Sequence, residues 1–496
     1  MTHPDGDRLN PTTAAGLTGS AALSLPALAS QGSSVGIVHL GIGAFHRAHQ
    51  AVYTEDAMLA AGENRWGICG VTQRSAAVRD QLLPQGGLYG VLQKSSTEPT
   101  SLRITGAVRE VLDGSSQVDA LLDRLAAAQT ALVTLTVTEK GYRRTGAGGL
   151  DIADPQVAAD LAGTAEPTSA VGRLVRGLQR RQRADAGPIT FLSCDNLNHN
   201  GAVLARLVQD FCAALPSAEA TPLAGWIAEQ VSFPSSMVDR IVPATTDADR
   251  AEARAISGLD DLGLVVAEPF RQWVIEDRFA GPRPAWELAG AQLTGDVTPY
   301  ELMKLRLLNG SHSTLAYLGA LRGHRTISDA VADPALREIA ERLIHEDMIP
   351  TVPQPDGVDL VAYGNQVLHR YENADLRHTC VQVAMDGSQK LPQRLVAPAL
   401  AAIGLGREPH LITLGLAAWM AYVARGRSVT GAELPLDDPL AEQLGQVRGL
   451  TDAGRIADRL LALESVFGTE LPAIDSWRAE LRSTLRPLLS GALPAP

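Results

Sequence analysis

A lysine, an asparagine and a histidine lie close together in the stretch TPYELMKLRLLNGSHST, residues 298–314. The stretch predicts a helix, because a Thr-Pro pair opens it and leucines follow at helical spacing. At about 100° per residue, Lys304, Asn309 and His312 fall within an arc of roughly 140°. A lysine beside amide and imidazole groups can exchange a proton with a carbonyl or an alcohol, which is workable redox chemistry.

Other interpretations of these residues are open. Most lysines on amphipathic helices are solvated, and asparagine and histidine often serve structure alone. Glu301 lies three residues after Thr298 and fits a capping box. Gly310 has no side chain and would let a ligand approach closely. These residues alone do not distinguish a catalytic role from a structural one, so the rest of the chain is needed.

Length and composition limit the possible protein classes. A chain of 496 residues is long enough for two or three domains. A net charge of −12 argues against a nucleic-acid binder. The 4 cysteines show no C-x-x-C spacing, which argues against a structural zinc site and favours reduced thiols in the cytoplasm. Residues 1–33 contain neither a signal peptide nor a membrane span, and we expect a loose tail there.

A pair of glycines follows the first buried-strand pattern, residues 34–40. Gly41 and Gly43 separate this strand from a helical pattern, which is how a dinucleotide-binding fold presents backbone N–H groups to a pyrophosphate. His46 occupies the third glycine position of the G-x-G-x-x-G fingerprint, so the fingerprint is incomplete. An ordinary tight turn explains the pair equally well.

The position after the second strand pattern, residues 66–71, bears on the choice of nucleotide. An acid there often holds the ribose hydroxyls of NAD. Here Thr72, Gln73 and Arg74 follow instead. Arg74 could face a 2′-phosphate or be solvated, so NADP(H) is not excluded.

Strand and helix patterns then alternate up to about residue 215, which predicts a parallel α/β sheet of the Rossmann type. Ligands bind beyond the carboxyl ends of such strands, where Gly41, Glu139 and Asn200 fall. Asn200 also precedes a helical pattern, and an N-cap role is equally compatible with it.

The second half of the chain is mostly helical in pattern. An irregular, Pro-rich link at 281–287 separates it from the strands. We therefore expect a dinucleotide-binding domain over 34–285 and a mostly α-helical domain over 286–496, with a boundary near 215–225 as the alternative.

Six ordered motifs identify a resemblance that covers nearly the whole chain after the tail. They are GIGAFHRAHQ (41–50), TLTVTEKGY (134–142), SCDN with NG (193–201), FPSSMVDRIVP (233–243), EPFRQWVIED (268–277) and MKLRLLNGSHS (303–313). Together they resemble the polyol-specific long-chain dehydrogenases, the mannitol dehydrogenase family. Within it, the stretches 316–324, 374–394 and 415–423 are most similar to the fructuronate reductases.

The resemblance implies NAD(H)-dependent, metal-independent hydride transfer between a secondary alcohol and a ketone. It places Lys304 on the catalytic lysine, Asn200 and Asn309 on paired amides that hold the reacting oxygen, and His312 on a substrate-orienting histidine. It also implies the following roles: Glu301 on the proton path; Val238, Asp239 and Lys390 on the substrate side; Gly41, Gly43, Ala44, Phe45, His46 and Glu139 at the cofactor. Without a metal, a base must take the alcohol proton, and lysine does so near neutral pH only when burial or positive charge lowers its pKa from about 10.4.

The substrate is the least determined part of this prediction. A uronate such as D-fructuronate carries a carboxylate and needs Arg or Lys contacts, for which Arg377, His378, Lys390 and Arg394 are candidates. D-Mannitol, D-fructose and tagaturonate remain alternatives, as does a nucleotide-binding sensor without turnover. We expect a cytoplasmic protein, a monomer or weak homo-oligomer, that binds a sugar acid or polyol and neither nucleic acid nor membrane.

Overall fold

The structure is a computed structural model that describes residues 8–25, 34–73 and 75–493. The chain divides into two compact units. The first comprises the residues up to Lys94 and Glu98–Thr298, and the second comprises Ser95–Thr97 and the residues from Pro299 onward. This division falls later in the chain than the expected 285/286 boundary.

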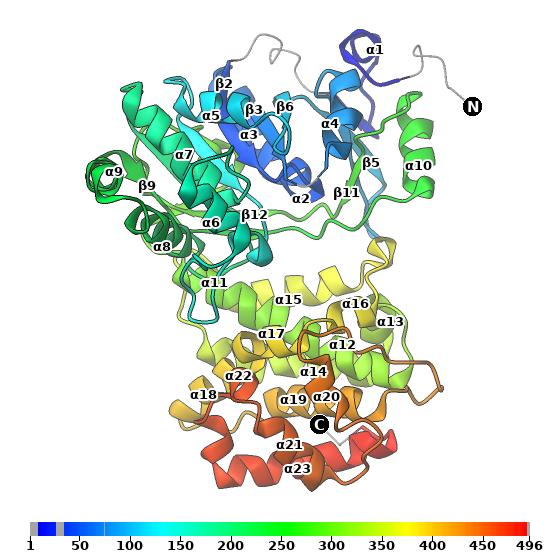
Figure 1. The fold of residues 1–496 in the computed structure, drawn as a ribbon. Coiled ribbons are helices and arrows are strands. Elements are labelled where there is room, and N and C mark those ends of the chain that lie inside the picture. The colour runs from blue at the N-terminus through cyan, green and yellow to red at the C-terminus, as the bar shows by residue number, and fades with distance from the viewer. Residues whose placement is uncertain (1–7, 26–33, 74, 494–496) are drawn as a thin grey trace. The chain divides into compact units, whose positions relative to one another are not determined.

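A parallel sheet organises the first unit (Figure 1). Among the described residues, six strands form it in the order β6-β3-β2-β7-β8-β9, and all neighbours run parallel. Counted along the chain this is the order 3-2-1-4-5-6 of a Rossmann fold, so the predicted class is confirmed. The strands are β2 (Val35–Leu40), β3 (Gly67–Thr72), β6 (Val108–Asp113), β7 (Leu132–Leu135), β8 (Ile189–Ser193) and β9 (Val231–Ser232).

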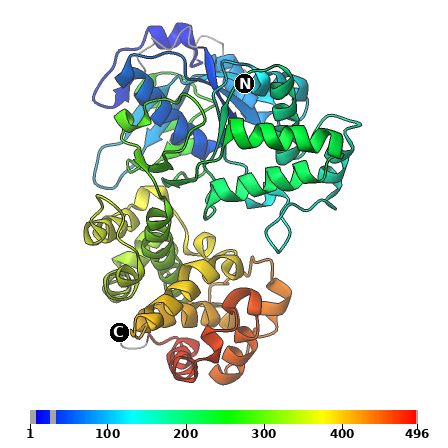
Figure 2. The ribbon, with the colours of Figure 1, turned by 90° about the vertical axis from the view of Figure 1, so that its left-hand side faces the viewer.

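Helices cover one face of this sheet, and α8 and α9 lie side by side (Figure 2). Alternation along β7 explains the two faces: Val133 and Leu135 belong to the cluster under these helices, whereas Leu132 belongs to the opposite cluster. The helices of this unit are α1 (Pro11–Ala15), α2 (Ala44–Ala48), α3 (Gln50–Ala61), α4 (Ala77–Leu82), α5 (Val118–Ala126), α6 (Pro155–Ala162), α7 (Ala170–Arg183), α8 (Asn200–Ala213), α9 (Ser217–Gln230) and α10 (Asp247–Ser257).

The opposite face packs against α2, α3 and strands of two smaller sheets, through a cluster that includes Tyr53, Trp273 and Trp286. The sheet ordered β1-β5-β4-β11 contains β1 (Leu23–Ser24), β4 (Tyr89–Gln93), β5 (Ser101–Thr105) and β11 (Val265–Ala267). The sheet ordered β10-β12-β13 contains β10 (Ser236–Asp239), β12 (Gln272–Glu276) and β13 (Gln292–Thr294).

The expected loose tail over residues 1–33 is wrong for its described part. β1 pairs in parallel with β5, with Leu23 opposite Leu102. Leu9, Ala14 and Leu23 are buried in a small cluster with β5 and β11. These apolar side chains tie the segment down, whereas residues 1–7 and 26–33 lie outside the described part of the chain.

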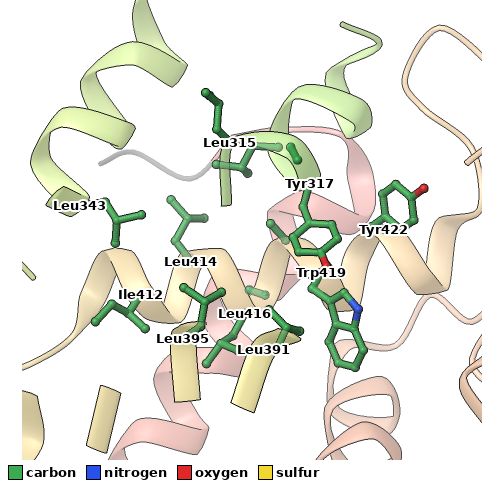
Figure 3. Packing of buried hydrophobic residues seen from close by; sticks show 14 of the residues in the cluster. Leu315, Tyr317, Leu343, Leu391, Leu395, Ile412, Leu414, Leu416, Trp419 and Tyr422 are labelled. Carbon is green, nitrogen blue, oxygen red and sulfur yellow. The ribbon is translucent and has the colours of Figure 1, made fainter. Parts of the chain in front are cut away.

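The second unit consists of helices, as predicted (Figure 1). Tyr317, Trp419 and Tyr422 pack with leucines at its centre (Figure 3), and the rings of Tyr317 and Tyr422 are 5.6 Å apart. Its α-helices are α11 (Thr298–Met303), α12 (Ser311–Arg322), α13 (Ile327–Ala332), α14 (Pro334–Arg342), α15 (Leu360–Tyr371), α16 (Cys380–Ala384), α17 (Gly387–Leu391), α18 (Ala397–Gly404), α19 (His410–Arg425), α20 (Ala441–Gly445), α21 (Ala453–Leu461), α22 (Glu464–Phe467) and α23 (Asp475–Ser490). Segments of π-helix are η6 (Lys304–Gly310), η7 (Leu343–Met348) and η10 (Pro392–Val396).

Candidate active site

The glycine turn follows β2, at the point where the strand order of the Rossmann sheet reverses between β2 and β7. Gly41 has φ +98°, and a Cβ there would lie 2.2 Å from the carbonyl oxygen of Thr136. Gly43 is exposed, and its nearest neighbour for a Cβ is the Gly41 oxygen at 3.8 Å. Gly41 therefore serves the turn itself, while Gly43 leaves open space that fits the approach of a dinucleotide. Ala44 and Phe45 begin α2 beside it, half-buried.

His46, in the third glycine position, points inward. Its ring is fully buried and stacks on His39 of β2, with ring centroids 3.3 Å apart. Burial lowers the pKa of His39 to about 3 and that of His46 well below its usual range, so both rings are neutral. Two flat rings in face-to-face contact let the helix approach the strand closely, which is the task of the third glycine. The ring of His46 thus packs between the turn and β2, and a cofactor contact of this residue stays a prediction.

The loops after β7 and β8 contain strained backbone. Thr138 has φ 69° and ψ 160°, a region that β-branched residues rarely adopt, and His199 is left-handed with φ 50°. Asp195 accepts hydrogen bonds from the Thr138 N–H at 2.7 Å and the Tyr142 hydroxyl at 2.6 Å. These bonds hold the two loops together at the edge where a Rossmann fold binds its ligand. The side chain of Glu139, in η4 (Glu139–Tyr142), lies outside the described atoms.

Asn200 is the first residue of α8 and is not its N-cap, which is His199. Its Nδ2 donates to the carbonyl oxygens of Asp195 at 3.0 Å and Ser236 at 2.7 Å, and its Oδ1 accepts from the Ser236 N–H at 2.9 Å. Both amide hydrogens are therefore engaged with backbone, and the side chain ties β8 to β10. The N-cap interpretation is wrong, and the oxygen-holding role stays a prediction that requires one of these bonds to exchange.

Val238 and Asp239 end β10, which pairs antiparallel with β12. Both side chains are buried. The Asp239 carboxylate is close enough to His49 to raise the pKa of that ring, although burial dominates and lowers it to about 3. Asp239 is thus a buried acid in the first unit, and its substrate role stays a prediction.

In the second unit, Lys304 and Asn309 lie in η6, the π-helix between α11 and α12. The regular α-helix expected through Gly310 is wrong here, because the i→i+5 pattern changes the angular spacing of side chains. A Cβ at Gly310 would lie 2.8 Å from the Arg394 carbonyl, so this glycine admits η10 and not a ligand. Asn309 is buried, Lys304 is half-buried, and Glu301 is buried in α11 just before them. Isolated π-helical turns frequently mark functional sites.

His312 lies in the first turn of α12, which directly follows η6. Its ring stacks on Tyr371, with centroids 5.0 Å apart, and meets the edge of His378 at 5.1 Å. Burial lowers the pKa of His312 well below its usual range, and His378 and Arg394 reinforce this shift. The imidazole is therefore neutral, with one donor and one acceptor nitrogen, which suits it to orient a hydroxyl group.

Cationic side chains gather around His312. Arg394 donates to Ser313 Oγ at 3.0 Å, and Lys390 donates to the Met385 carbonyl at 2.5 Å. Burial, and then Arg394, lower the pKa of Lys390 to about 8. Arg377 is exposed at the end of a short 3-10 turn, with φ 50°. The structure therefore brings Arg394, Arg370 and Lys390 near enough to His312 to lower its pKa, whereas the substrate role expected for Arg377 stays a prediction.

Two sets of residues in these sites were missed by sequence reasoning. Tyr371, the last residue of α15, touches both η6 and His312, but its position at a helix end carries no signal in the sequence. Asp195 and Tyr142 lie inside motifs that carried the resemblance, and their pairing across 53 positions could not be seen from spacing.

Comparison with known proteins identifies the family of this chain. The mannitol dehydrogenase Rossmann domain matches residues 35–288, and the mannitol dehydrogenase C-terminal domain matches residues 296–489. The chain belongs to the mannitol dehydrogenase family. The resemblance derived from the sequence motifs is thereby confirmed, and with it an NAD-dependent oxidoreductase that acts on CH–OH groups.

Three relatives illustrate the range of this family. D-Mannonate oxidoreductase of Escherichia coli is 42% identical over 88% of this chain and 89% of its own. Mannitol 2-dehydrogenase of Phaeosphaeria nodorum is 36% identical over 94% of this chain and 81% of its own. The structure of Pseudomonas fluorescens mannitol 2-dehydrogenase with NAD and D-mannitol is 37% identical, covers 97% of this chain and 96% of its own, and has a TM-score of 0.84.

Within the described residues, no helix is long and apolar enough to cross a membrane. The same part of the chain contains no group of three or more His, Cys, Asp or Glu arranged to hold a metal ion.

Proposed function

We propose that this enzyme reduces D-fructuronate to D-mannonate with NADH, and that Lys304 supplies the proton. The observation that supports a uronate is the cationic cluster of the second unit, in which Lys390 and Arg394 lie near His312. A carboxylate needs such partners, whereas a neutral polyol gives no reason to place half-buried cationic groups there.

The residues of the second unit supply the rest of the proposed proton transfer. NADH, when bound to the first unit, supplies the hydride to the ketone carbon. Lys304 gives its proton to the ketone oxygen as that oxygen gains charge, and accepts the proton in the reverse direction. Asn309 donates an amide hydrogen to the same oxygen, a contact worth roughly 3 kcal/mol in favourable geometry. His312 orients a neighbouring hydroxyl group.

Mannitol 2-dehydrogenase activity is the second candidate. It is favoured by the similarity over nearly the whole chain to the Pseudomonas fluorescens enzyme, whose structure holds D-mannitol. The two candidates share the hydride and proton transfers and differ in what the cationic cluster contacts.

The substrate test is NADH oxidation by the purified protein, with D-fructuronate and D-fructose compared at equal concentrations. We expect kcat/KM to be at least about 100-fold higher for D-fructuronate, since a charge-assisted hydrogen bond to its carboxylate contributes about 1.5–3 kcal/mol. A preference for D-fructose would assign mannitol 2-dehydrogenase activity. Tight NADH binding with turnover of neither would identify a sensor.

Two substitutions of Lys304 test its role. Lys304→Ala should lower kcat by several orders of magnitude and leave NADH affinity unchanged, because the proton donor is lost while the nucleotide turn is intact. Lys304→Arg keeps the charge but cannot release a proton near neutral pH, and should be similarly impaired. Arg342→Ala, which removes an exposed ion pair with Glu346 in the same unit, is the matched control. Near-normal turnover in either Lys304 variant would exclude the role.

A further inference from the structure

Tyr371 contacts the π-helix at a backbone carbonyl. Its hydroxyl donates to the Leu308 oxygen at 2.6 Å. Ser311 Oγ donates to the Leu307 oxygen and to the Leu308 oxygen, the latter at 3.2 Å, and lies 2.9 Å from the Tyr371 hydroxyl. The Ser311 backbone N–H also donates to the Leu308 oxygen, so this carbonyl at the end of the π-helix accepts from the backbone and from side chains. Tyr371 and Ser311 provide the side-chain donors.

The ring of Tyr371 has a second contact. It stacks on His312 with an interplanar angle of 25°. Tyr371 is itself only 3% exposed. One buried side chain therefore fixes the carbonyl that directly precedes Asn309 and also the plane of the His312 ring.

We propose that Tyr371 is a positioning residue for proton transfer: it holds η6 in its π-helical form, and so sets Lys304, Asn309 and His312 in their relative geometry. The inference rests on the proposed role of Lys304. If the Leu308 carbonyl loses the Tyr371 hydroxyl, η6 can return to the i→i+4 hydrogen bonds of an α-helix. That change rotates Lys304 relative to His312. A displacement of about 1 Å in a reacting group can cost about 100-fold in rate.

Tyr371→Phe tests this inference because it removes only the hydroxyl and keeps the ring. Tyr422→Phe is the matched control: Tyr422 is equally buried in the same unit, and its hydroxyl donates to the Pro435 carbonyl at 2.8 Å. Tyr371→Phe loses the bond to Leu308 and the contact with Ser311, and Tyr422→Phe loses the bond to Pro435, so both melting temperatures should fall by a few degrees. Only Tyr371→Phe should lower kcat, by about 10- to 100-fold, with the KM for NADH unchanged.

Ser311→Ala is the second variant and removes the other side-chain donor to the same carbonyl, while the backbone N–H of residue 311 stays. We expect a fall in kcat in the same direction, and a loss in the double variant Tyr371→Phe/Ser311→Ala that is less than the product of the single losses. In a Lys304→Ala background, Tyr371→Phe should reduce the residual rate by less than about twofold, because the group that it positions is gone. A merely structural role would lower all rates in proportion to stability.

The outcomes separate this inference from the proposed function. Near-normal turnover of Lys304→Ala would overturn the role of Lys304. Loss of turnover in Lys304→Ala, combined with kcat values for Tyr371→Phe and Ser311→Ala that match Tyr422→Phe, would overturn the inference alone. An equal effect of Tyr371→Phe in the presence and absence of Lys304 would also overturn it.

Discussion

At the scale of single residues, the charge state of a side chain distinguishes the groups of the second unit. His312 is kept neutral by burial and by the positive groups near it, whereas Lys390 stays an ammonium up to a pH of about 8. Through the family resemblance, the sequence predicts that both residues act on the substrate. The sequence does not predict the charge states of His312 and Lys390. These depend on burial and on nearby charged groups such as Arg394, which only the folded structure brings close.

The lowered pKa of Lys390 predicts a pH dependence. The pKa falls from 10.5 to about 8, so the group is charged below pH 8 and neutral above it. If it binds the substrate carboxylate, kcat/KM for D-fructuronate should fall as pH rises through about 8, since kcat/KM reports the free enzyme. Taking the ratio to kcat/KM for D-fructose at each pH cancels the titration of Lys304.

Lys390→Met is the variant that checks this dependence. It should lower kcat/KM for D-fructuronate by about 10- to 100-fold at pH 7, the range of a charge-assisted hydrogen bond, and should make the ratio independent of pH. A ratio that still falls near pH 8 in this variant would assign the titration to another group.

At the scale of elements, regular segments were predictable and irregular ones were not. Helical periodicity predicts helices over 360–371 and 169–183, and an apolar run predicts a strand over 34–40. α15 has the first of these ranges, and α7 and β2 each begin one residue later than predicted, because their apolar periodicity is unbroken. The sequence pattern over 102–108 predicts a single strand. The structure has β5 and β6 there, in different sheets, since the Gly106 N–H between them donates to the buried Glu55. The π-helix η6 was unpredictable for a similar reason. The Leu308 carbonyl of η6 accepts a hydrogen bond from the Tyr371 hydroxyl, which lies 63 positions further along the chain. Sequence periodicity contains no information on such contacts.

The glycine turn gives a prediction at this scale. Gly41→Ala should destabilise the fold by at least about 1–2 kcal/mol, because φ +98° is unfavourable for alanine and the Cβ would clash with Thr136. Gly43→Ala has φ −80° and no close neighbour, so its effect on stability should stay within about 0.5 kcal/mol. Urea unfolding without nucleotide measures both.

NADH affinity completes this comparison. If the backbone at Gly43 approaches the pyrophosphate, Gly43→Ala should weaken NADH binding at least about tenfold, although the variant is stable. Titration of NADH fluorescence measures this. An unchanged affinity for Gly43→Ala would remove the turn from the cofactor site, whatever the stability of Gly41→Ala.

At the scale of the whole molecule, the chain consists of a Rossmann unit followed by a helical unit. The order of a Rossmann sheet followed by helices was predictable, because alternation of strands and helices gives way to helical periodicity along the sequence. The point of division was not, since the segment from the Pro-rich link to Thr298 contains η5 (Trp286–Ala289) and β13, and Trp286 is fully buried in a cluster of the first unit. The Pro-rich composition of residues 281–287 indicated a link between domains, whereas the first unit continues through η5 and β13.

This division predicts where each ligand protects the backbone from hydrogen exchange. NADH at about 100 times its Kd stabilises what it binds by about 2.7 kcal/mol. Protection by NADH alone should therefore appear in peptides that cover 41–50 and 134–142, because these contain the glycine turn and the loop held by Asp195. D-Mannonate added to the NAD complex of Lys304→Ala, which does not turn over, should add protection over 304–313 and 385–394. Mass spectrometry of the two complexes measures both effects.

Protection of 304–313 by NADH alone, with no change at 41–50, would contradict the assignment of the nucleotide to the Rossmann unit. Protection of 304–313 without 385–394 on addition of D-mannonate would contradict the carboxylate contact at Lys390, because that contact requires η10 and the lysine before it to be held by the substrate.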